Sequence, residues 1–535
     1  MDGDYGGVEV WVIVFTSALA VLIALLVSCT GEELSKSAPA VSLRGERKTF
    51  RQLVLPDAAV KVVDKPTSPQ HSKVNRPQTM KLAMARTAEG IMAWLMYGAH
   101  TPWDDLELNK DEAAGHRPLL VFVNSRSGGG QGVDLLQELQ ILLHRLQVVD
   151  LKEETPEAAL RWWSKTGQRY RVLVCGGDGT VGWVLSCLEE LQPEYPPPVA
   201  ILPIGTGNDL SRVLGWGGGF AGGSVVPVLQ KVGEAHAAYI DRWLVACRDV
   251  LPEGRPASLP AVGRERKNLT MCNYLGVGID AAVALDFHQM RERSPHLFVS
   301  RLVNKAWYLK SGTVNRYSRL CHGLPSSIVL ECDGSSVEVP PNMEGVVVLN
   351  ISSFGGGCDL WGWASDDEDD DLDEAEENNY DGGQDRNRST LQRTLSQARP
   401  SMQDGKLEVV GVHGSFQLGA AQVGLYSAVR LAQASRVKIT TRTALPIQVD
   451  GEPWLFARGG EIEISWKSQA LMLAHTATGS HAVATDVIDW ALERNHITVT
   501  QRNILMKEIA RRAQAGFGGP RTGSLPNLRS LGAPP

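Results

Sequence analysis

The spacing of apolar residues along the chain predicts two kinds of folded region. Between residues 116 and 236, short apolar runs alternate with longer segments whose apolar residues recur every three or four positions. The runs have the length of buried strands and cover 118–124, 170–175 and 199–204. Helical spacing follows the first two runs, at 133–146 and 181–191. Strands that alternate with helices predict an α/β domain with a mostly parallel sheet.

After residue 236 the pattern changes to short strands separated by turn residues, which predicts a second, β-sandwich-like domain over 237–470. A polar and strongly acidic segment, 365–404, interrupts this region and has the composition of a disordered insert. Helical spacing returns in the C-terminal segment 471–515. The residues 516–535 are rich in glycine and proline, and we expect a mobile tail there.

The N-terminal residues 1–30 have the pattern of a transmembrane anchor. Val10 to Val27 carries no charge and as a helix would span about 27 Å, close to the thickness of a bilayer core. Acidic residues precede it and basic residues follow it, so the positive-inside rule predicts a single pass with the rest of the chain in the cytoplasm, at the endoplasmic reticulum or plasma membrane. A buried helix or an unusual signal peptide are the alternatives.

Residues 31–115 have the composition of a linker with little core of its own. Apolar residues at helical spacing between about 80 and 97 predict an amphipathic helix within it. Such a helix either packs on the folded body or lies on a membrane surface.

Composition and charge narrow the class of protein. The 535 residues exceed what one core supports, so two or three domains are expected. The net charge of −7 depends on ten acidic residues between 366 and 377, and the rest of the chain is weakly basic. This balance suits phosphate ligands and an anionic lipid surface, and it lacks the basic stripe of a nucleic-acid-binding protein. The eight cysteines form no Cys-x-x-Cys pair, which argues against a zinc module.

Each of the three predicted strands is followed by a glycine-rich turn with polar residues. The carboxyl ends of parallel strands meet at one edge of a sheet, and glycine turns there present backbone N–H groups to anions. The polar residues of the turns are Asn124, Ser127, Asp178, Thr180, Thr206, Asn208 and Asp209. We expect a phosphate-binding cleft, although one such turn alone is often a mere connector. No GxxxxGK[ST] loop occurs, so a nucleoside triphosphate would be held by backbone amides and Mg²⁺.

Carboxylates in two glycine-containing motifs are candidates for the chemistry. Asp178 in GGDGT suits a role on Mg²⁺ or on a nucleophile, or it is a turn-former that bonds its own loop. Asp450 and Glu452 in VDGEPW lie two residues apart and in a strand would point the same way, which suits metal binding or general base catalysis. The alternative for this pair is an Asp-Gly hairpin turn.

Together these motifs resemble the diacylglycerol kinase family, in the family's order and over about residues 117–460. The stretches that carry the resemblance are VNSRSGG, CGGDGTVGWVL, LPIGTGNDLSRVLGWGGG, NYLGVGIDAAVALDFHQMR, VNKAWYLKSG, GGGCDLWG, DGKLEVVGV and PIQVDGEPW. The resemblance implies a catalytic, ATP-binding domain at 116–236 and an accessory domain at 237–470. It also implies transfer of the ATP γ-phosphate to the primary hydroxyl of diacylglycerol in a membrane.

The resemblance implies a role for individual residues as well. Asp178 and Asp450 would orient or deprotonate the hydroxyl, Glu452 would join them at Mg²⁺, and Asp404 would belong to a structural metal site. Asp280 would contact the lipid headgroup. The residues expected around the ATP phosphates are Asn124, Ser127, Gly128, Gly129, Gly176, Gly177, Gly179, Thr180, Gly205, Thr206, Gly207, Asn208 and Asp209.

Some features depart from the family or leave alternatives open. Ser125 and Arg126 replace the usual proline and lysine of the first loop, and the cysteine-rich lipid-sensing modules of many members are absent. Ser389 and Ser396 follow arginines as in the substrates of basophilic protein kinases, which predicts a regulatory kinase as a partner. A sphingosine or ceramide kinase, or an inactive membrane-anchored scaffold, are the competing functions. The oligomeric state stays open.

Overall fold

A computed structural model describes the chain over a series of segments between residues 50 and 515. Apart from a few isolated residues, these are 50–56, 59–62, 106–113, 115–249, 266–293, 318–362, 397–414, 428–456, 459–475 and 496–515. The predicted anchor, the predicted helix at 80–97, most of the acidic insert with Ser389 and Ser396, and the tail at 516–535 lie outside them. Within these segments no helix is long and apolar enough to cross a bilayer.

Part of the expected linker 31–115 belongs to the folded core, which corrects that expectation for these residues. Leu53, at the end of the 3₁₀ helix η1 (Arg51–Leu53), and Leu55 are fully buried. The Gln147 side chain donates to the Leu53 carbonyl and accepts the Leu55 N–H, both at 2.7 Å. A small antiparallel sheet joins β1 (Val60–Val62) to β2 (Leu106–Leu108). These apolar stretches are too short to show a period in the sequence.

The predicted parallel sheet is formed by β3 (Leu119–Val123), β4 (Val148–Asp150), β5 (Arg171–Gly176) and β6 (Val199–Pro203), in the order β4-β3-β5-β6. Every residue of β3, β5 and β6 is buried, which is why these strands read as continuous apolar runs. The α-helices of this region are α4 (Lys110–Ala113), α5 (Gln131–Leu142), α6 (Pro156–Lys165), α7 (Asp178–Leu191), α8 (Asp209–Val213) and α9 (Val226–Glu234). Short 3₁₀ helices η5 (Gly128–Gly130) and η6 (Arg145–Gln147) flank α5.

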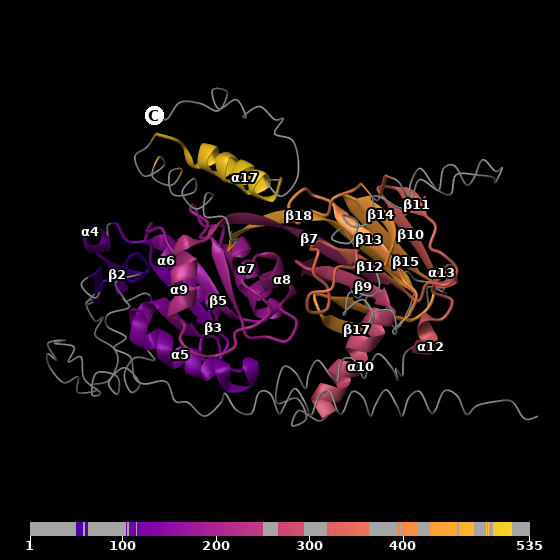
Figure 1. Cartoon of the computed structure of the whole chain (residues 1–535), viewed down its shortest axis with the longest axis horizontal. Helices are drawn as coiled ribbons and strands as arrows, with labels where there is room; N and C mark the ends of the chain where they lie inside the picture. Colours follow the sequence, from indigo (N-terminus) through magenta and orange to yellow (C-terminus); the bar gives the residue numbers. More distant parts are fainter. Residues whose placement is uncertain are drawn as a thin grey trace, which may run out of the picture. The chain divides into compact units, whose positions relative to one another are not determined.

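Two long strands carry this sheet into the second region (Figure 1). β7 (His236–Asp249) and β18 (Gly460–Ala474) pair antiparallel along their lengths, and Met472 of β18 pairs parallel with Val199 of β6. One ten-stranded sheet results, which also contains β8 (Arg266–Met271), β10 (Ile328–Cys332), β11 (Ser335–Val337) and β15 (Arg436–Thr441). The expected boundaries at 236 and 470 therefore do not separate independent sheets, and residues 471–474 are strand rather than helix.

A second, six-stranded sheet is antiparallel throughout. Its strands, in spatial order, are β14 (Val429–Ala434), β13 (Leu407–Val412), β12 (Gly345–Leu349), β9 (Tyr274–Gly278), β16 (Leu445–Val449) and β17 (Glu452–Phe456). Its apolar side chains share one core with those of β7, β10, β15 and β18. Helices α10 (Ile279–Arg293), α12 (Ser318–Cys321), α13 (Leu324–Ser327) and α17 (Val499–Ala515) complete the described elements. The expected mixed α/β class, with a parallel sheet and an antiparallel sheet, is confirmed.

Candidate active site

Three loops meet at the carboxyl edge of the parallel sheet, as the sequence predicted. Asn124 follows β3, and its side-chain amide donates to the Thr180 hydroxyl at 3.1 Å, in the first turn of α7. The backbone N–H of Asn124 donates to the Cys175 carbonyl of β5 at 2.9 Å. The first loop is therefore tied to the second.

The second and third loops touch through bare backbone at Gly177 and Gly205. A Cβ atom added to Gly205 would lie 2.6 Å from the Gly177 Cα, and one added to Gly176 would lie 2.6 Å from the Thr180 Cβ. Glycine is needed at these positions for the loops to pack. Gly179 differs, since a Cβ atom there would meet nothing within 4 Å. Packing therefore does not explain the glycine at 179, whereas close approach of a ligand to the backbone would.

The first loop turns through three consecutive glycines. Gly128, Gly129 and Gly130 have φ angles of 72°, 62° and 108°, which L side chains rarely adopt. Ser127 is half-buried beside them, and the turn leads directly into α5. Successive N–H groups of such a turn, at the start of a helix, suit an anion.

Asn208 fixes the shape of the third loop from inside. It has a φ of 55°, is 2% exposed, and donates to the carbonyls of Gly205 at 2.8 Å and Gly218 at 2.9 Å. Its Oδ1 is buried and has no hydrogen-bond partner among the described residues. Thr206 is exposed on the same loop and Gly207 is half-buried.

Asp209 was expected among the phosphate-binding residues, but its carboxylate faces the second region. Oδ1 accepts the Ser353 hydroxyl at 2.6 Å and the N–H groups of Gly356 at 2.9 Å and Gly357 at 3.1 Å. Oδ2 accepts the Tyr274 hydroxyl at 3.1 Å. Asp209 is 1% exposed. It shapes the cleft by joining two regions of the chain, and its side chain is occupied by that task.

Asp178 begins α7 and lies half-buried at the meeting point of the loops. Its Oδ2 accepts the backbone N–H of Asp209 at 2.9 Å. Burial, followed by the negative charges of Asp209 and Asp450, raises the pKa of Asp178 to about 7. The Asp178 carboxyl therefore titrates near neutral pH.

Asp450 lies in the hairpin turn between β16 and β17, which corrects the expectation that it shares a strand face with Glu452. Asp450 and Gly451 have φ angles of 50° and 83°, and Val449 pairs with Glu452 across the turn. This is the Asp-Gly turn held open as the alternative. Glu452 is exposed and begins β17, whereas Asp450 belongs to the turn, so the two side chains do not share one strand face.

The Asp450 carboxylate also binds a distant backbone segment. It accepts the N–H groups of Cys272 at 2.7 Å, Asn273 at 2.8 Å and Tyr274 at 3.0 Å. Burial raises the pKa of Asp450 to about 6, although these three bonds lower it. Tyr274 connects the two carboxylates, since its N–H binds Asp450 and its hydroxyl binds Asp209, whose own N–H binds Asp178.

Two residues near these carboxylates were not found from the sequence. Asn273 is 2% exposed, and its Oδ1 is buried without a partner among the described residues. Arg242 of β7 donates to Ser186 and Glu189 of α7 at 2.9 and 2.8 Å, and its charge lowers the pKa of Asp450. Asn273 is the first residue of the quoted stretch NYLGVGIDAAVALDFHQMR and Arg242 lies between two of the quoted stretches, but neither shows a spacing that would mark it.

Asp404 and Asp280 have other local surroundings. Asp404 is exposed and accepts the Lys406 N–H at 3.0 Å. Asp280, in the first turn of α10, is buried and bonds the Gln448 amide at 3.2 Å, and burial raises its pKa to about 6. Among the residues the structure describes, no group of three or more His, Cys, Asp or Glu side chains could hold a metal ion. The metal roles of Asp404 and Glu452 stay predictions.

Comparison with known proteins identifies both regions. Residues 118–239 match the diacylglycerol kinase catalytic domain and residues 270–453 match the diacylglycerol kinase accessory domain. The chain belongs to the diacylglycerol kinase family. It is 41% identical over 403 residues to diacylglycerol kinase 2 of Arabidopsis thaliana, which covers 74% of this chain and 52% of that protein.

A relative from Homo sapiens, diacylglycerol kinase theta, is 44% identical over 348 residues, covering 64% of this chain and 33% of the relative. The chain thus matches about half or less of the length of these family members. A solved structure, a putative diacylglycerol kinase from Bacillus anthracis str. Sterne, aligns over 66% of this chain and 96% of its own with a TM-score of 0.38 and 17% identity. That similarity is too distant to support a conclusion.

Replacing Asp209 tests its role in joining the catalytic and accessory domains of this family member. Asp209→Ala leaves four donors without their acceptor, so we expect a loss of about 3–5 kcal/mol in unfolding free energy. Ser353→Ala removes one donor and should cost about 1 kcal/mol. Denaturant unfolding measures both changes. Equal, small losses in the two variants would contradict the role, and hydrogen exchange at residues 353–357 should rise in Asp209→Ala.

The raised pKa of Asp178 predicts a pH-dependent cost of this carboxylate to stability. The folded state binds the Asp178 proton more tightly than the unfolded state, whose pKa is near 3.8. The contribution of Asp178 to the unfolding free energy is therefore fully present below about pH 4, and it is lost as the pH rises through about 7. Asp178→Asn should be more stable than wild type at pH 8, by on the order of 1–3 kcal/mol, and the gain should vanish toward pH 4. Thermal unfolding without nucleotide and with a chelator measures this, and an equal or lower stability of the variant at pH 8 would refute the cause assigned.

Proposed function

We propose that the chain is an ATP-dependent lipid kinase that phosphorylates the primary hydroxyl of 1,2-diacylglycerol, giving phosphatidic acid and ADP. The observation that carries this proposal is the convergence of three glycine loops of one domain with a carboxylate from each of the two domains. The match to the catalytic and accessory domains of the family supports the choice of substrate over sphingosine or ceramide.

The residues present fit ATP. Gly130 of the first loop and Gly179 in the first turn of α7 have nothing within 4 Å of an added Cβ atom, so the backbone there is open to a ligand. The unpartnered Asn208 Oδ1 is a buried acceptor beside the same backbone, which suits a donor such as a ribose hydroxyl rather than a phosphate oxygen. No lysine of a P-loop is available, so the amides and the positive end of α7 would have to receive the phosphates.

The residues also fit Mg²⁺, which usually takes one or two protein carboxylates and completes its shell with phosphate oxygens and water. Asp178 and Asp450 are the two carboxylates in the cleft. A bound Mg²⁺ would supply charge neutralisation for the phosphates.

The hydroxyl needs a proton acceptor, and Asp178 and Asp450 are the two candidates. Their pKa values, about 7 and about 6, lie near neutral pH, where a general base is most effective. The three N–H bonds to Asp450 hold it in place, and the Asp209 N–H holds Asp178. The unpartnered Asn273 Oδ1 offers an acceptor next to Asp450 that would orient the hydroxyl.

Location and regulation are proposals from the sequence. A diacylglycerol substrate lies in a membrane, and the apolar run Val10 to Val27 would tether the chain there with its catalytic domain on the cytoplasmic side. Ser389 and Ser396 would receive phosphate from a regulatory protein kinase beside the acidic insert, adding charge that an anionic lipid surface repels.

A phosphorylation assay tests the function. Purified chain with labelled ATP and mixed micelles should convert diacylglycerol and leave sphingosine and ceramide unchanged. Asp178→Asn and Asp450→Asn should each lower kcat by about 10²-fold or more, because each variant loses a charge needed at the reacting hydroxyl. A chain that labels sphingosine or ceramide better, or that labels none of the lipids, would overturn the proposal.

A matched control separates the role of Asp450 from that of its turn. Asp333 precedes Gly334 in another hairpin, has a φ of 49°, and its carboxylate accepts the N–H groups of Ser435 and Arg436. It is exposed and lies in the β10–β11 turn. Asp333→Asn should therefore keep kcat within about twofold, since it makes the same change in the same kind of turn.

Gly179→Ala tests whether ATP approaches the start of α7. The added methyl group meets nothing in the protein, and alanine is the better helix former, so we expect stability to rise by about 0.5–1 kcal/mol. The same methyl group would occupy the space offered to the phosphates, so the Kd for ATP should rise at least tenfold. Thermal unfolding and equilibrium binding measure the two effects. A stabilised variant with unchanged ATP affinity would show that the nucleotide does not contact this turn.

A further inference from the structure

Arg212, in the last turn of α8, places a positive charge where the two domains meet. A Cβ atom added to Gly218 would overlap the Arg212 guanidinium, and one added to Gly357 would lie 3.2 Å from its Nη1 atom. Gly218 belongs to the catalytic domain and Gly357 to the accessory domain. The absence of a side chain at these two positions therefore gives the guanidinium its space between the domains.

The contacts of Gly218 connect this guanidinium to the glycine loops. The Asn208 amide donates to the Gly218 carbonyl at 2.9 Å and to the Gly205 carbonyl at 2.8 Å. Gly205 in turn packs against Gly177 of the second loop, since a Cβ atom added to Gly205 would lie 2.6 Å from the Gly177 Cα. The charge of Arg212 therefore lies at the same edge of the parallel sheet as the loops proposed to bind ATP.

The Arg212 side chain lacks a partner within the protein. Among the residues that the structure describes, none forms an ion pair or a side-chain hydrogen bond with it, and its Nε atom is buried without an acceptor. Asp209 lies three residues earlier on α8, but its two oxygens already accept four hydrogen bonds from the accessory domain. A buried donor without an acceptor costs free energy, and a ligand that supplies the acceptor removes that cost. Arg212 is half-buried, so a ligand can still reach it.

The chemistry of the guanidinium group selects the ligand. Arginine stays ionised at physiological pH, and its planar set of N–H donors matches the oxygens of a phosphate group. The contact with Gly357 places Arg212 toward the accessory domain, which also supplies Asp450. In the proposed reaction the lipid hydroxyl meets the γ-phosphate near Asp450, so the terminal phosphates of ATP are the part of the nucleotide that extends toward Arg212.

We propose that Arg212 binds the terminal phosphates of ATP, an inference that rests on the function proposed above. The guanidinium is held between a loop of each domain, so this charge is in place only where the catalytic and accessory domains are joined. AMP lacks the β- and γ-phosphates. Arg212 therefore contributes to the affinity for ATP and not to the affinity for AMP.

Equilibrium binding of ATP and AMP to the full-length chain, in the presence of Mg²⁺, tests this role. Arg212→Gln should raise the Kd for ATP roughly tenfold or more, because charge-assisted hydrogen bonds to phosphate are lost. The same variant should change the Kd for AMP by less than about twofold. Arg212→Lys keeps the charge but lacks the Nε donor and the planar fork, so its ATP affinity should lie between those of wild type and Arg212→Gln.

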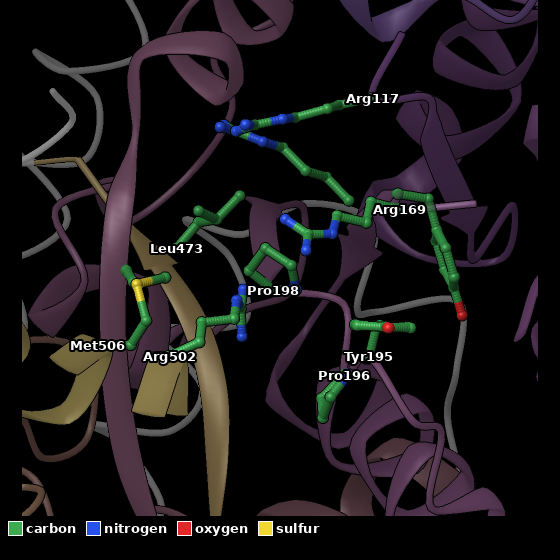
Figure 2. Close-up of a pocket in the computed structure, with 11 residues that line it drawn as sticks. Arg117, Arg169, Tyr195, Pro196, Pro198, Leu473, Arg502 and Met506 are labelled. Atoms are coloured by element: carbon green, nitrogen blue, oxygen red, sulfur yellow. The ribbon is translucent and has the colours of Figure 1, made fainter. Parts of the chain in front are cut away.

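Arg169→Gln is the matched control. Arg169 is half-buried like Arg212 and belongs to the same domain, but it lines a pocket at the opposite edge of the parallel sheet, before β5 (Figure 2). The substitution removes the same charge far from the glycine loops, so the Kd for ATP should stay within about twofold of wild type.

Unchanged ATP affinity in Arg212→Gln overturns the proposal. An equal loss of ATP and AMP affinity also overturns it, since a purely structural role would weaken both. If Arg212→Gln does not melt cooperatively, Arg212→Lys makes the same comparison between the two nucleotides. A wild-type chain that binds ATP without phosphorylating diacylglycerol contradicts the proposed function alone, and the ratio of ATP to AMP affinity still decides the role of Arg212. A wild-type chain that binds no ATP overturns both.

Discussion

The carboxylate of Asp209 holds together the two halves of the candidate active site. Its four hydrogen bonds reach Tyr274, Ser353 and the glycines after it, while its own N–H donates to Asp178. A buried charge is tolerated when its acceptor capacity is filled, and here donors from the accessory domain fill it. The position of a catalytic-domain carboxylate therefore depends on a loop more than 140 residues further along the chain.

The shared sheet gives this contact a rigid frame. β7 and β18 run from the antiparallel region to β6, so the two domains of the family are joined by continuous backbone hydrogen bonds as well as by side chains. The side chain of Arg242 on β7 donates hydrogen bonds to α7, the helix that begins with Asp178. Asp450 reaches the same cleft from a hairpin of the other sheet. The accessory domain thus supplies half of the site, and a separate catalytic domain would lack it.

The features predicted correctly from the sequence are those that depend on residues close together in the chain. Strands such as β5 were readable because parallel strands covered on both faces need unbroken apolar runs, and their glycine turns had to meet at one edge. The direction of Asp450 and Glu452 was misjudged because a period of two holds only inside a strand, and Asp450 has a φ of 50°. Asp209 was expected to lie at the phosphates because it belongs to a glycine-rich turn. Its actual partners could not be found from the sequence, since they lie 65 and 144 residues away. The sequence pattern placed a domain boundary at residue 236, but β7 begins there and pairs with β18, which joins the two regions in one sheet.

Charge explains why the proposed function would require a cation at this arrangement. Above about pH 7 both carboxylates are ionised, and a triphosphate bound at the glycine loops, as proposed, would carry charge of the same sign. Backbone amides and the end of α7 offset part of that repulsion, but each contributes only a partial charge. Asp178 and Asp450 would hold a divalent ion, whose positive charge would offset this repulsion. Under the proposed function, the same carboxylates that lower the stability of the protein without ligand would make nucleotide binding depend on metal.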